Sequence, residues 1–297
     1  MKNYNSVIIG HITLDYNTDH LGITEKRAGG AVLYSSGAGY ALGHNILAVT
    51  SVGKGDEGYL DAFTLPKENV HCVVKDSSCI MKNHYLTPDK ERRNSVCAMK
   101  GNPFTISDIP AVDSPIYHLA GLVVGDFDGE LIKELSKKGK VVLDAQGFLR
   151  NVSPDDGKMY FKDWEDKKKF LPYVTYLKTD ALETEILTGT SDRYEGAKIL
   201  HSWGANEVLI THNSEVLVYD GKEFFTCPIR ARNLSGRTGR GDTTTAVYTL
   251  ERERNDIKTA LLIATATVSL KMEMPGVFAG DRGAVINYIE EFYNDYK

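Results

Sequence analysis

The stretch that decides the fold lies where an irregular loop is expected to become a helix, and it reads Gly236-Arg237-Thr238-Gly239-Arg240-Gly241-Asp242-Thr243-Thr244-Thr245-Ala246. Glycine tolerates positive φ and lets a ligand approach the main chain closely. The first N–H groups of a helix lack partners within it and lie at the positive end of its dipole, so they favour an anion such as phosphate. Asp242 adds a carboxylate beside these donors. The stretch therefore predicts an anion site next to a general base, which transfer of a phosphoryl group to a hydroxyl requires.

Taken alone, the same stretch favours a simpler interpretation. Asp242 would then cap the helix through its carboxylate, and Gly239 and Gly241 would be turn residues. The anion site becomes the favoured interpretation only together with the other motifs of the chain.

Outward from this stretch, short β-rich runs alternate with helix-period segments over most of the 297 residues. Such alternation predicts an α/β fold, a three-layer αβα sandwich with a mostly parallel central sheet. We expect strands at 7–9, 46–52, 116–119, 141–144, 174–178 and 208–211, and helices at 34–42, 129–138, 180–187, 192–203, 243–252, 257–271 and 283–294. A hairpin is expected to turn at Asp220-Gly221.

Two polar segments, at about 12–28 and 71–101, interrupt the alternation. Their alternating pattern predicts antiparallel strands outside the main sheet, which would form a small β lid. A lid could close over a substrate and exclude water, or it could join two copies of the chain in a homodimer, and the two roles can coexist. Because no repeat or linker is present, residues 1–297 are expected to form a single domain with this lid.

Composition limits the classes of function. A hydrophobic content of 42% and a charged content of 25% are ordinary for a globular protein. The net charge of −5 argues against nucleic acid as a partner. There is no signal-peptide pattern and no run of 18 apolar residues, so no membrane association is expected. None of the four cysteines forms a C-x-x-C pair, which predicts a cytoplasmic protein without a zinc site.

Two places suit a polyol. Asp15 can accept hydrogen bonds from two neighbouring hydroxyls, and the pair Gly29-Gly30 leaves room for a ring, although two adjacent glycines alone usually form a turn. Gln146 follows Asp144 at the end of an expected strand and offers both a donor and an acceptor. Asp144 is equally interpreted as a residue that caps the strand end.

Asp180 and Glu183 are three residues apart at the start of an expected helix and share one of its faces. Two such carboxylates suit Mg²⁺ that is held largely through water. Taken alone, they are better explained as first-turn acids that face the helix dipole.

Together these motifs resemble the PfkB, or ribokinase-like, family of carbohydrate kinases over nearly the whole chain. The resemblance rests on Gly29-Gly30, Gly53-x-x-Asp56, Asp180-x-x-Glu183 before Leu187-Thr188-Gly189, and Thr238-Gly239-Arg240-Gly241-Asp242-Thr243. Within the family the chain is most similar to bacterial myo-inositol kinases, through residues 144–150, 163–165 and 236–242.

The resemblance implies ATP-dependent phosphorylation of a hydroxyl on a small polyol, most similar to myo-inositol, with Mg²⁺. Asp242 would be the base, and the amides of Gly239, Arg240 and Gly241 would form the anion hole. The remaining roles would be Asp15, Gly29, Gly30 and Gln146 for the substrate, Lys178, Thr211, Asn213, Arg237 and Thr238 for the nucleotide, and Asp180 and Glu183 for Mg²⁺ through water.

The chain departs from the family pattern at several positions. Gly236 replaces an aspartate, so the resemblance does not carry over a monovalent-cation site built on that residue. Arg240 replaces an alanine, Asp180 an asparagine and Asn213 a glycine. A kinase of ribose, another sugar or a nucleoside is therefore the first alternative, and a catalytically silent sugar or nucleotide sensor on the same fold is the second. A dinucleotide-dependent oxidoreductase ranks third, because G-x-G-x-x-G is absent.

Overall fold

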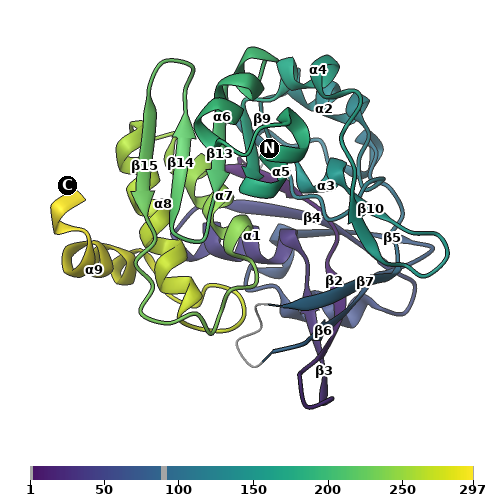
Figure 1. Ribbon diagram of the computed structural model, residues 1–297. Helices are drawn as coiled ribbons and strands as arrows, with labels where there is room; N and C mark the ends of the chain where they lie inside the picture. The colour runs from purple at the N-terminus through teal and green to yellow at the C-terminus, as the bar shows by residue number, and fades with distance from the viewer. Residues whose placement is uncertain (1–2, 88–91, 297) are drawn as a thin grey trace.

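The computed structural model describes residues 3–87 and 92–296 and is built on a nine-stranded sheet (Figure 1). Seven neighbouring strands, from β5 to β13, run parallel, and β14 and β15 extend the sheet antiparallel. In spatial order the strands are β15 (Phe224–Pro228), β14 (Glu215–Tyr219), β13 (Glu207–Thr211), β12 (Tyr176–Asp180), β9 (Lys140–Asp144), β8 (Ile116–Leu119), β1 (Ser6–Ile9), β4 (Ile46–Gly53) and β5 (Val70–Lys75).

Successive residues of the central strands belong to two different layers of the core. On β1, Val7 and Ile9 pack into one hydrophobic cluster and Ile8 into another, and all three are fully buried. Side chains of a strand alternate between its faces, so a sheet that is covered on both sides needs an uninterrupted apolar run. This requirement explains why the central parallel strands are mostly hydrophobic.

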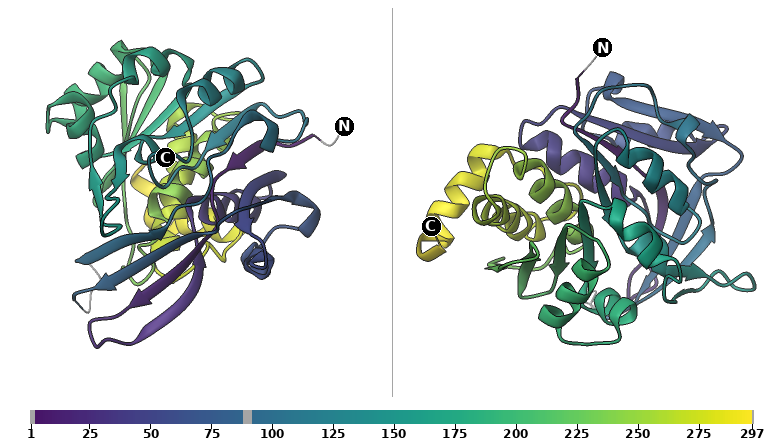
Figure 2. Two further views of the ribbon diagram at one scale, coloured as in Figure 1. Left: turned by 90° about the vertical axis from the view of Figure 1, so that its right-hand side faces the viewer. Right: turned by 90° about the horizontal axis from the view of Figure 1, so that it is seen from above.

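Helices cover both faces of the sheet, which confirms the expected three-layer α/β sandwich (Figures 1 and 2). One layer holds α1 (Ala31–Ala41), α7 (Arg240–Glu251), α8 (Ile257–Met272) and α9 (Arg282–Phe292). The other holds α2 (Gly129–Ser136), α4 (Lys167–Phe170), α5 (Ala181–Thr188) and α6 (Arg193–Ser202), and the short α3 (Gln146–Leu149) follows β9. None of the helices in residues 3–87 and 92–296 is long and apolar enough to span a bilayer.

A separate four-stranded sheet projects from the main body and forms the lid (Figure 2). Its order is β3 (Thr24–Gly29), β2 (Thr13–Thr18), β6 (Cys79–Tyr85) and β7 (Arg93–Met99). The two hairpins are antiparallel, as expected, but the central pair β2–β6 is parallel. Both strands continue outward from parallel strands of the main sheet, β1 and β5, and therefore leave it in the same direction.

The expectation that the second lid segment begins at residue 71 is wrong. Residues 70–75 form β5, which pairs in parallel with β4 at the edge of the main sheet. An edge strand is half exposed, so its sequence alternates in the same way as that of a lid strand. The polar character of this segment therefore reflects its edge position.

Candidate functional site

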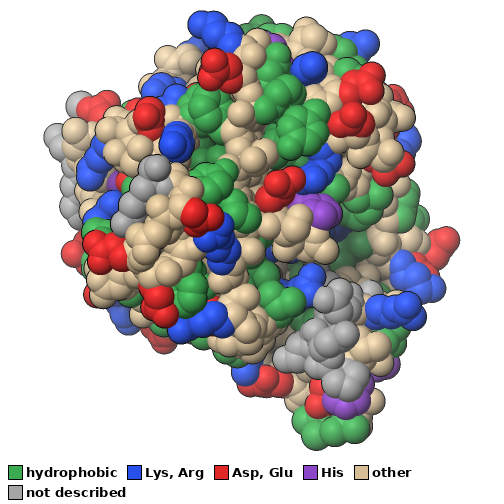
Figure 3. All heavy atoms as spheres, turned by 60° about the vertical axis from the view of Figure 1, so that its left-hand side comes forward, with side chains coloured by type: hydrophobic (Ala, Val, Ile, Leu, Met, Phe, Trp, Pro, Cys, Tyr) green, Lys and Arg blue, Asp and Glu red, His purple; other side chains and the backbone are tan. Residues whose placement is uncertain are grey.

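A cleft of about 420 Å³ lies between the lid and the carboxyl ends of the parallel strands. In an open α/β sheet, the loops at these strand ends form the usual ligand site. Around it, acidic and basic side chains are interspersed on the surface (Figure 3). The cleft is lined by most of the predicted site residues, namely Asp15, Gly30, Gln146, Lys178, Asp180, Thr211, Arg237, Thr238, Gly239, Arg240, Gly241 and Asp242.

The start of α7 forms the floor of the cleft. Gly239 is in the left-handed conformation, with φ of 81°, and the helix begins at the next residue, three residues earlier than expected. A Cβ at position 239 would lie 2.3 Å from Cδ1 of Tyr34, so the turn requires glycine for space as well as for φ.

The amide of Arg240 does not belong to the anion hole that the sequence predicted. It donates to the carbonyl of Arg237 at 3.2 Å and closes the turn before the helix. In the described part of the chain, the N–H groups of Gly241 and Asp242 have no backbone acceptor. They are the helix-start donors that an anion in the cleft would meet.

Asp242 lies in the first turn of α7, half-buried, and lines the cleft. Burial raises the pKa of its carboxyl to about 6, and the neighbouring Asp144 carboxylate adds to the rise. The positive charges of Lys178, Lys271 and Arg150 oppose it. A carboxylate with a pKa slightly below neutral is suited to accept a proton at neutral pH.

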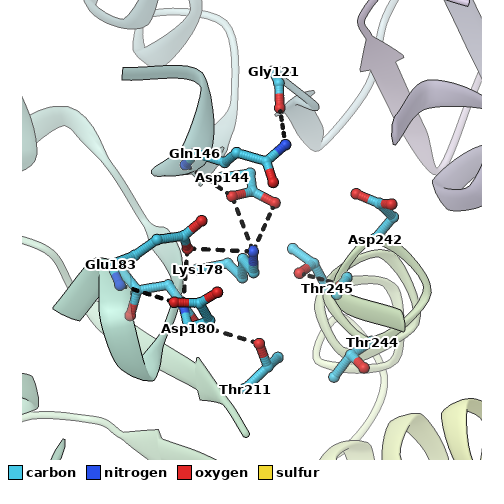
Figure 4. Close-up of polar contacts among 12 residues, drawn as sticks. Gly121, Asp144, Gln146, Lys178, Asp180, Glu183, Thr211, Asp242, Thr244 and Thr245 are labelled. Carbon is cyan, nitrogen blue, oxygen red and sulfur yellow. Dashed lines mark hydrogen bonds and ion pairs between the residues drawn. The ribbon is translucent and has the colours of Figure 1, made fainter. Parts of the chain in front are cut away.

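Lys178 is buried at the end of β12, and its ammonium bridges two carboxylates (Figure 4). Its Nζ lies 3.0 Å from Oδ2 of Asp144 and 3.5 Å from Oε2 of Glu183. Burial opposes the charge of Lys178, but Asp144 and the other nearby carboxylates outweigh it and raise the pKa of the lysine. Burial also raises the pKa of Glu183. Lys178 therefore carries a fixed positive charge into the cleft floor opposite Asp242.

Asp180 and Glu183 form a capping box at the start of α5. Asp180 accepts from the Glu183 amide at 2.8 Å, and Glu183 accepts from the Asp180 amide at 2.8 Å. Asp180 lines the cleft, whereas Glu183 is 1% exposed and lies behind it. Within residues 3–87 and 92–296, no three acidic, histidine or cysteine side chains converge as a metal site. Of this pair, only Asp180 faces a ligand in the cleft.

Asp15 on β2 lines the cleft from the lid. The Thr13 hydroxyl donates to Oδ1 of Asp15 at 2.6 Å and orients the carboxylate. Gly29 does not line the cleft, but a Cβ there would lie 2.3 Å from Oδ2 of Asp15, so this glycine makes room for the carboxylate. Gly30 has φ of 101° and is the N-cap residue of α1. The two glycines therefore position the site through space and backbone conformation.

Gln146 orients the side chain of Arg150. Its Nε2 donates to the Gly121 carbonyl at 3.2 Å, and its Oε1 accepts from the guanidinium of Arg150. Both polar ends of the amide are engaged, and Arg150 lines the cleft beside it. The lining of the cleft thus combines the acid Asp15 with a guanidinium that Gln146 holds in place.

Thr211, Arg237 and Arg240 also line the cleft. Burial lowers the pKa of His212, which follows β13, and the charges of Arg193 and Arg240 lower it further. Asn213, predicted to meet the nucleotide, is exposed and is not among the lining residues. The turn that carries it points its side chain to solvent.

Sequence reasoning missed the lid residues that line the cleft. Ser95 donates to Oδ1 of Asn83 at 2.7 Å, and Nδ2 of Asn83 donates to Oδ1 of Asn17 at 3.1 Å. All three face the cleft from β7, β6 and β2. We call them the lid relay. Residues two apart on a strand share a face, so Asn17 lies on the same face of β2 as Asp15. This spacing was the sequence signal that could have predicted a lid residue in the cleft.

Residues 5–280 match the family described as pfkB family carbohydrate kinase. A cytidine kinase from Thermococcus kodakarensis is 27% identical over 252 residues, which cover 80% of this chain and 84% of the relative.

Two groups of solved structures are similar. A pyrophosphate-dependent kinase in the ribokinase family, solved as a sulfate complex, is 33% identical with a TM-score of 0.84, and the match covers 95% of this chain and 99% of the other. A further structure concerns conversion of a pyrophosphate-dependent myo-inositol-1 kinase into a myo-inositol-3 kinase by one Asn→Leu and one Ser→Leu substitution. It is 31% identical with a TM-score of 0.83 over 97% and 99% of the two chains. Ribokinase from Arabidopsis thaliana, with ribose and ATP, is 16% identical at a TM-score of 0.76 over 97% and 99%, and shares the fold.

Proposed function

The chain belongs to the pfkB family of carbohydrate kinases, phosphotransferases that act on an alcohol group, and we propose that its acceptor is myo-inositol. The observation that supports phosphoryl transfer to a hydroxyl is the start of α7, where the N–H groups of Gly241 and Asp242 lie beside the Asp242 carboxylate. This places donors for a phosphoryl group and a base for a hydroxyl within one helical turn.

In the proposed reaction, Asp242 accepts the proton of the acceptor hydroxyl as the hydroxyl oxygen attacks the phosphorus. The bridging P–O bond of the donor breaks at the same time, and orthophosphate leaves from pyrophosphate, or ADP from ATP. The two helix-start amides and the Lys178 ammonium offset the negative charge on the phosphoryl oxygens. With a pKa of about 6, Asp242 is largely ionised at pH 7.5 and ready to take the proton.

We call the part of the cleft around Asp15, the lid relay and Arg150 the acceptor side, and its polar side chains suit a polyhydroxylated ring. Asp15, the lid relay and Arg150 supply donors and acceptors on several sides of the cavity. A similar structure, 33% identical, contains a pyrophosphate analog and myo-inositol in a pyrophosphate-dependent kinase. We infer that each hydroxyl of the ring meets a polar group in this cleft.

The lid relay supports a choice between two hydroxyls. The hydroxyls on C1 and C3 of myo-inositol are mirror-related, so only contacts that fix the ring orientation distinguish them. In a similar enzyme, Asn→Leu and Ser→Leu substitutions change the product from position 1 to position 3. Asn83 and Ser95 are bonded to each other in this cleft, and we propose that they direct phosphorylation to position 1.

For the donor we propose pyrophosphate, ahead of the ATP expected from the family resemblance. Arg237 and Arg240 line the part of the cleft in which we expect the donor, and Arg240 stands where the family often has alanine. Two guanidinium groups suit a small, highly charged anion, because each can bind phosphate oxygens through two N–H groups. Asn213, the expected contact to a nucleotide, lies outside the cleft. ATP is the second donor to test.

Mg²⁺ fits the donor site through Asp180, whose carboxylate lines the cleft. Magnesium uses one or two protein carboxylates together with phosphates and water, so it needs no larger protein cage. Glu183 would act by holding Asp180 in its capping geometry. When bound, the ion would neutralise charge on the donor phosphates.

A nucleoside is the second candidate acceptor. The cytidine kinase relative favours it, and Met81, Leu122 and Met159 add apolar surface to the cleft on which a base could rest. The test must therefore compare nucleosides with myo-inositol as acceptors.

The test measures product formation with Mg²⁺ for two donors, pyrophosphate and ATP, against myo-inositol, ribose, fructose, cytidine, adenosine and no acceptor. We expect the highest kcat/KM for myo-inositol with pyrophosphate, and its collapse in Asp242→Asn. A preference for cytidine or ribose would show that myo-inositol is not the acceptor, and a preference for ATP would show that pyrophosphate is not the donor. Donor cleavage that is independent of every acceptor would refute the kinase assignment.

Two other expectations stay predictions. A homodimer through the lid strands is supported by exposed Leu21 and Ile23, which are 72% and 64% exposed at the end of the lid, and light scattering of the purified protein measures it. A cytoplasmic location was expected from the cysteine pattern, and fractionation of cells tests it.

A further inference from the structure

Lys271, near the end of α8, is fully buried beneath the loop that leads into the anion site. Its Nζ donates to the Gly236 carbonyl at 2.6 Å and to the Thr238 carbonyl. It also lies 5.3 Å from the centroid of the Tyr34 ring. Lysine is among the residues least often buried, so an ammonium held this way demands compensating contacts. Two main-chain carbonyls and an aromatic face provide part of them. Burial still lowers the pKa of Lys271 to about 8, against the opposing charge of Asp242, so the ammonium form prevails at neutral pH.

Position 236 is closed to any side chain. A Cβ there would lie 1.8 Å from the carbonyl oxygen of Met274, and the Gly236 amide donates to the Met272 carbonyl at 2.7 Å. The loop is therefore packed against the end of α8, the helix that carries Lys271. An aspartate, which the family often has at this position, does not fit here.

These two observations decide whether the loop suits a bound monovalent metal ion. Such an ion needs converging oxygen ligands, and the carbonyl oxygens of Gly236 and Thr238 already accept from the Lys271 ammonium. The acidic ligand is excluded at position 236. The residues present therefore do not fit a potassium or sodium site in this loop.

We propose that Lys271 is a built-in cation that replaces a bound monovalent ion, fixes the loop before α7, and makes phosphoryl transfer independent of added potassium. Lys271 is a positioning residue, because it acts through the carbonyls of residues 236 and 238 on the amides that follow. Its charge also favours the ionised form of Asp242, whose pKa it lowers. The inference rests on the proposed kinase function for its effect on rate, but the cation site itself is independent of that function.

The first test uses wild-type protein, without any substitution. Thermal unfolding and turnover are measured at equal ionic strength in potassium chloride, ammonium chloride and tetramethylammonium chloride. We expect the same Tm and the same kcat in all three salts. A saturable increase of either quantity with potassium would overturn the proposal.

The second test removes the ammonium. Lys271→Ala leaves the carbonyls of Gly236 and Thr238 without this donor, and we expect kcat in tetramethylammonium chloride to fall roughly 10–100-fold, with KM for the acceptor nearly unchanged. Ammonium or potassium should restore part of the loss, which a purely structural role would not predict. Lys258→Ala, an exposed lysine on the same helix, is the matched control and should behave as wild type in every salt.

Full kcat in Lys271→Ala, or a loss that no monovalent cation relieves, would overturn the proposal. If the alanine variant does not fold, Lys271→Met keeps the aliphatic volume and must still lose rate, and the wild-type salt comparison decides in any case. If no donor and acceptor pair gives turnover, the proposed function fails, while the cation dependence of Tm in wild type and Lys271→Ala still tests Lys271.

Discussion

Replacing Asp242 by asparagine removes the carboxylate that would accept the proton and keeps nearly the same size and shape of side chain. The substitution removes the base and leaves the helix start, the amides and the cleft intact. A positioned general base contributes roughly 10²–10⁴-fold to rate, so kcat should fall by that factor. KM for the acceptor should change little, because an amide still accepts a hydrogen bond from a hydroxyl.

The same substitution should stabilise the fold at neutral pH. Raising the pKa of Asp242 from 3.8 to about 6 means that the native site disfavours the ionised carboxylate by about 3 kcal/mol. In wild type this contribution lowers stability as pH rises from 3.8 to about 6, since the native state binds the proton more tightly than the unfolded state. Asparagine has no such charge, so we expect the variant to be more stable by roughly 1–3 kcal/mol at pH 7.5.

The assay is steady-state turnover with myo-inositol and the preferred donor, together with chemical unfolding at pH 4, 6 and 7.5. Wild-type kcat/KM should fall about tenfold per pH unit below about pH 6, as Asp242 takes up its proton. A folded Asp242→Asn variant with near-normal kcat would refute the role as base. A variant that is less stable than wild type at pH 7.5 would refute the electrostatic account of the site.

Three further predictions follow from the cleft floor. Gly241→Val places a Cβ 3.2 Å from Cε of Lys178 and shields a helix-start amide, so kcat should drop roughly 10²–10³-fold with the fold retained by circular dichroism; unchanged kcat would remove the amides from the account. Arg240→Ala should raise KM for pyrophosphate at least about tenfold, the loss of one charged hydrogen-bond pair, with the calorimetric Kd for myo-inositol unchanged; equal loss for both ligands would place Arg240 elsewhere. Lys178→Met leaves Asp144 and Glu183 buried without their cation and should destabilise the protein by about 3–5 kcal/mol in urea unfolding, and a neutral result would contradict the bridging geometry.

The central parallel strands could be predicted because burial on both faces makes most of their residues apolar. The strand expected at 116–119 is observed with those bounds, and those at 46–52 and 208–211 differ by one residue. The edge strand β5 could not be distinguished from a lid strand, because half exposure produces the same alternation. The pairing of strands in the lid could not be predicted either, because the parallel β2–β6 pair depends on how both strands leave the main sheet.

Much of the candidate site was predictable because its residues follow strand ends or helix starts. Asp180, Thr211 and Asp242 meet in one cleft for this reason. Lys271 escaped prediction because its partners are main-chain carbonyls, which leave no pattern in a sequence. Asn213 was placed by motif position alone, and the exposed turn around it removes it from the cleft.

The most direct measurement of the central claim is a ³¹P NMR time course of the enzyme with Mg²⁺, pyrophosphate and myo-inositol, repeated with ATP as donor. We expect one inositol monophosphate and one orthophosphate for each pyrophosphate consumed, and the same signals to grow at least about a hundredfold more slowly with Asp242→Asn. Conversion of pyrophosphate to orthophosphate alone, or a donor that stays intact in both experiments, would contradict the assignment of this cleft to phosphoryl transfer onto myo-inositol.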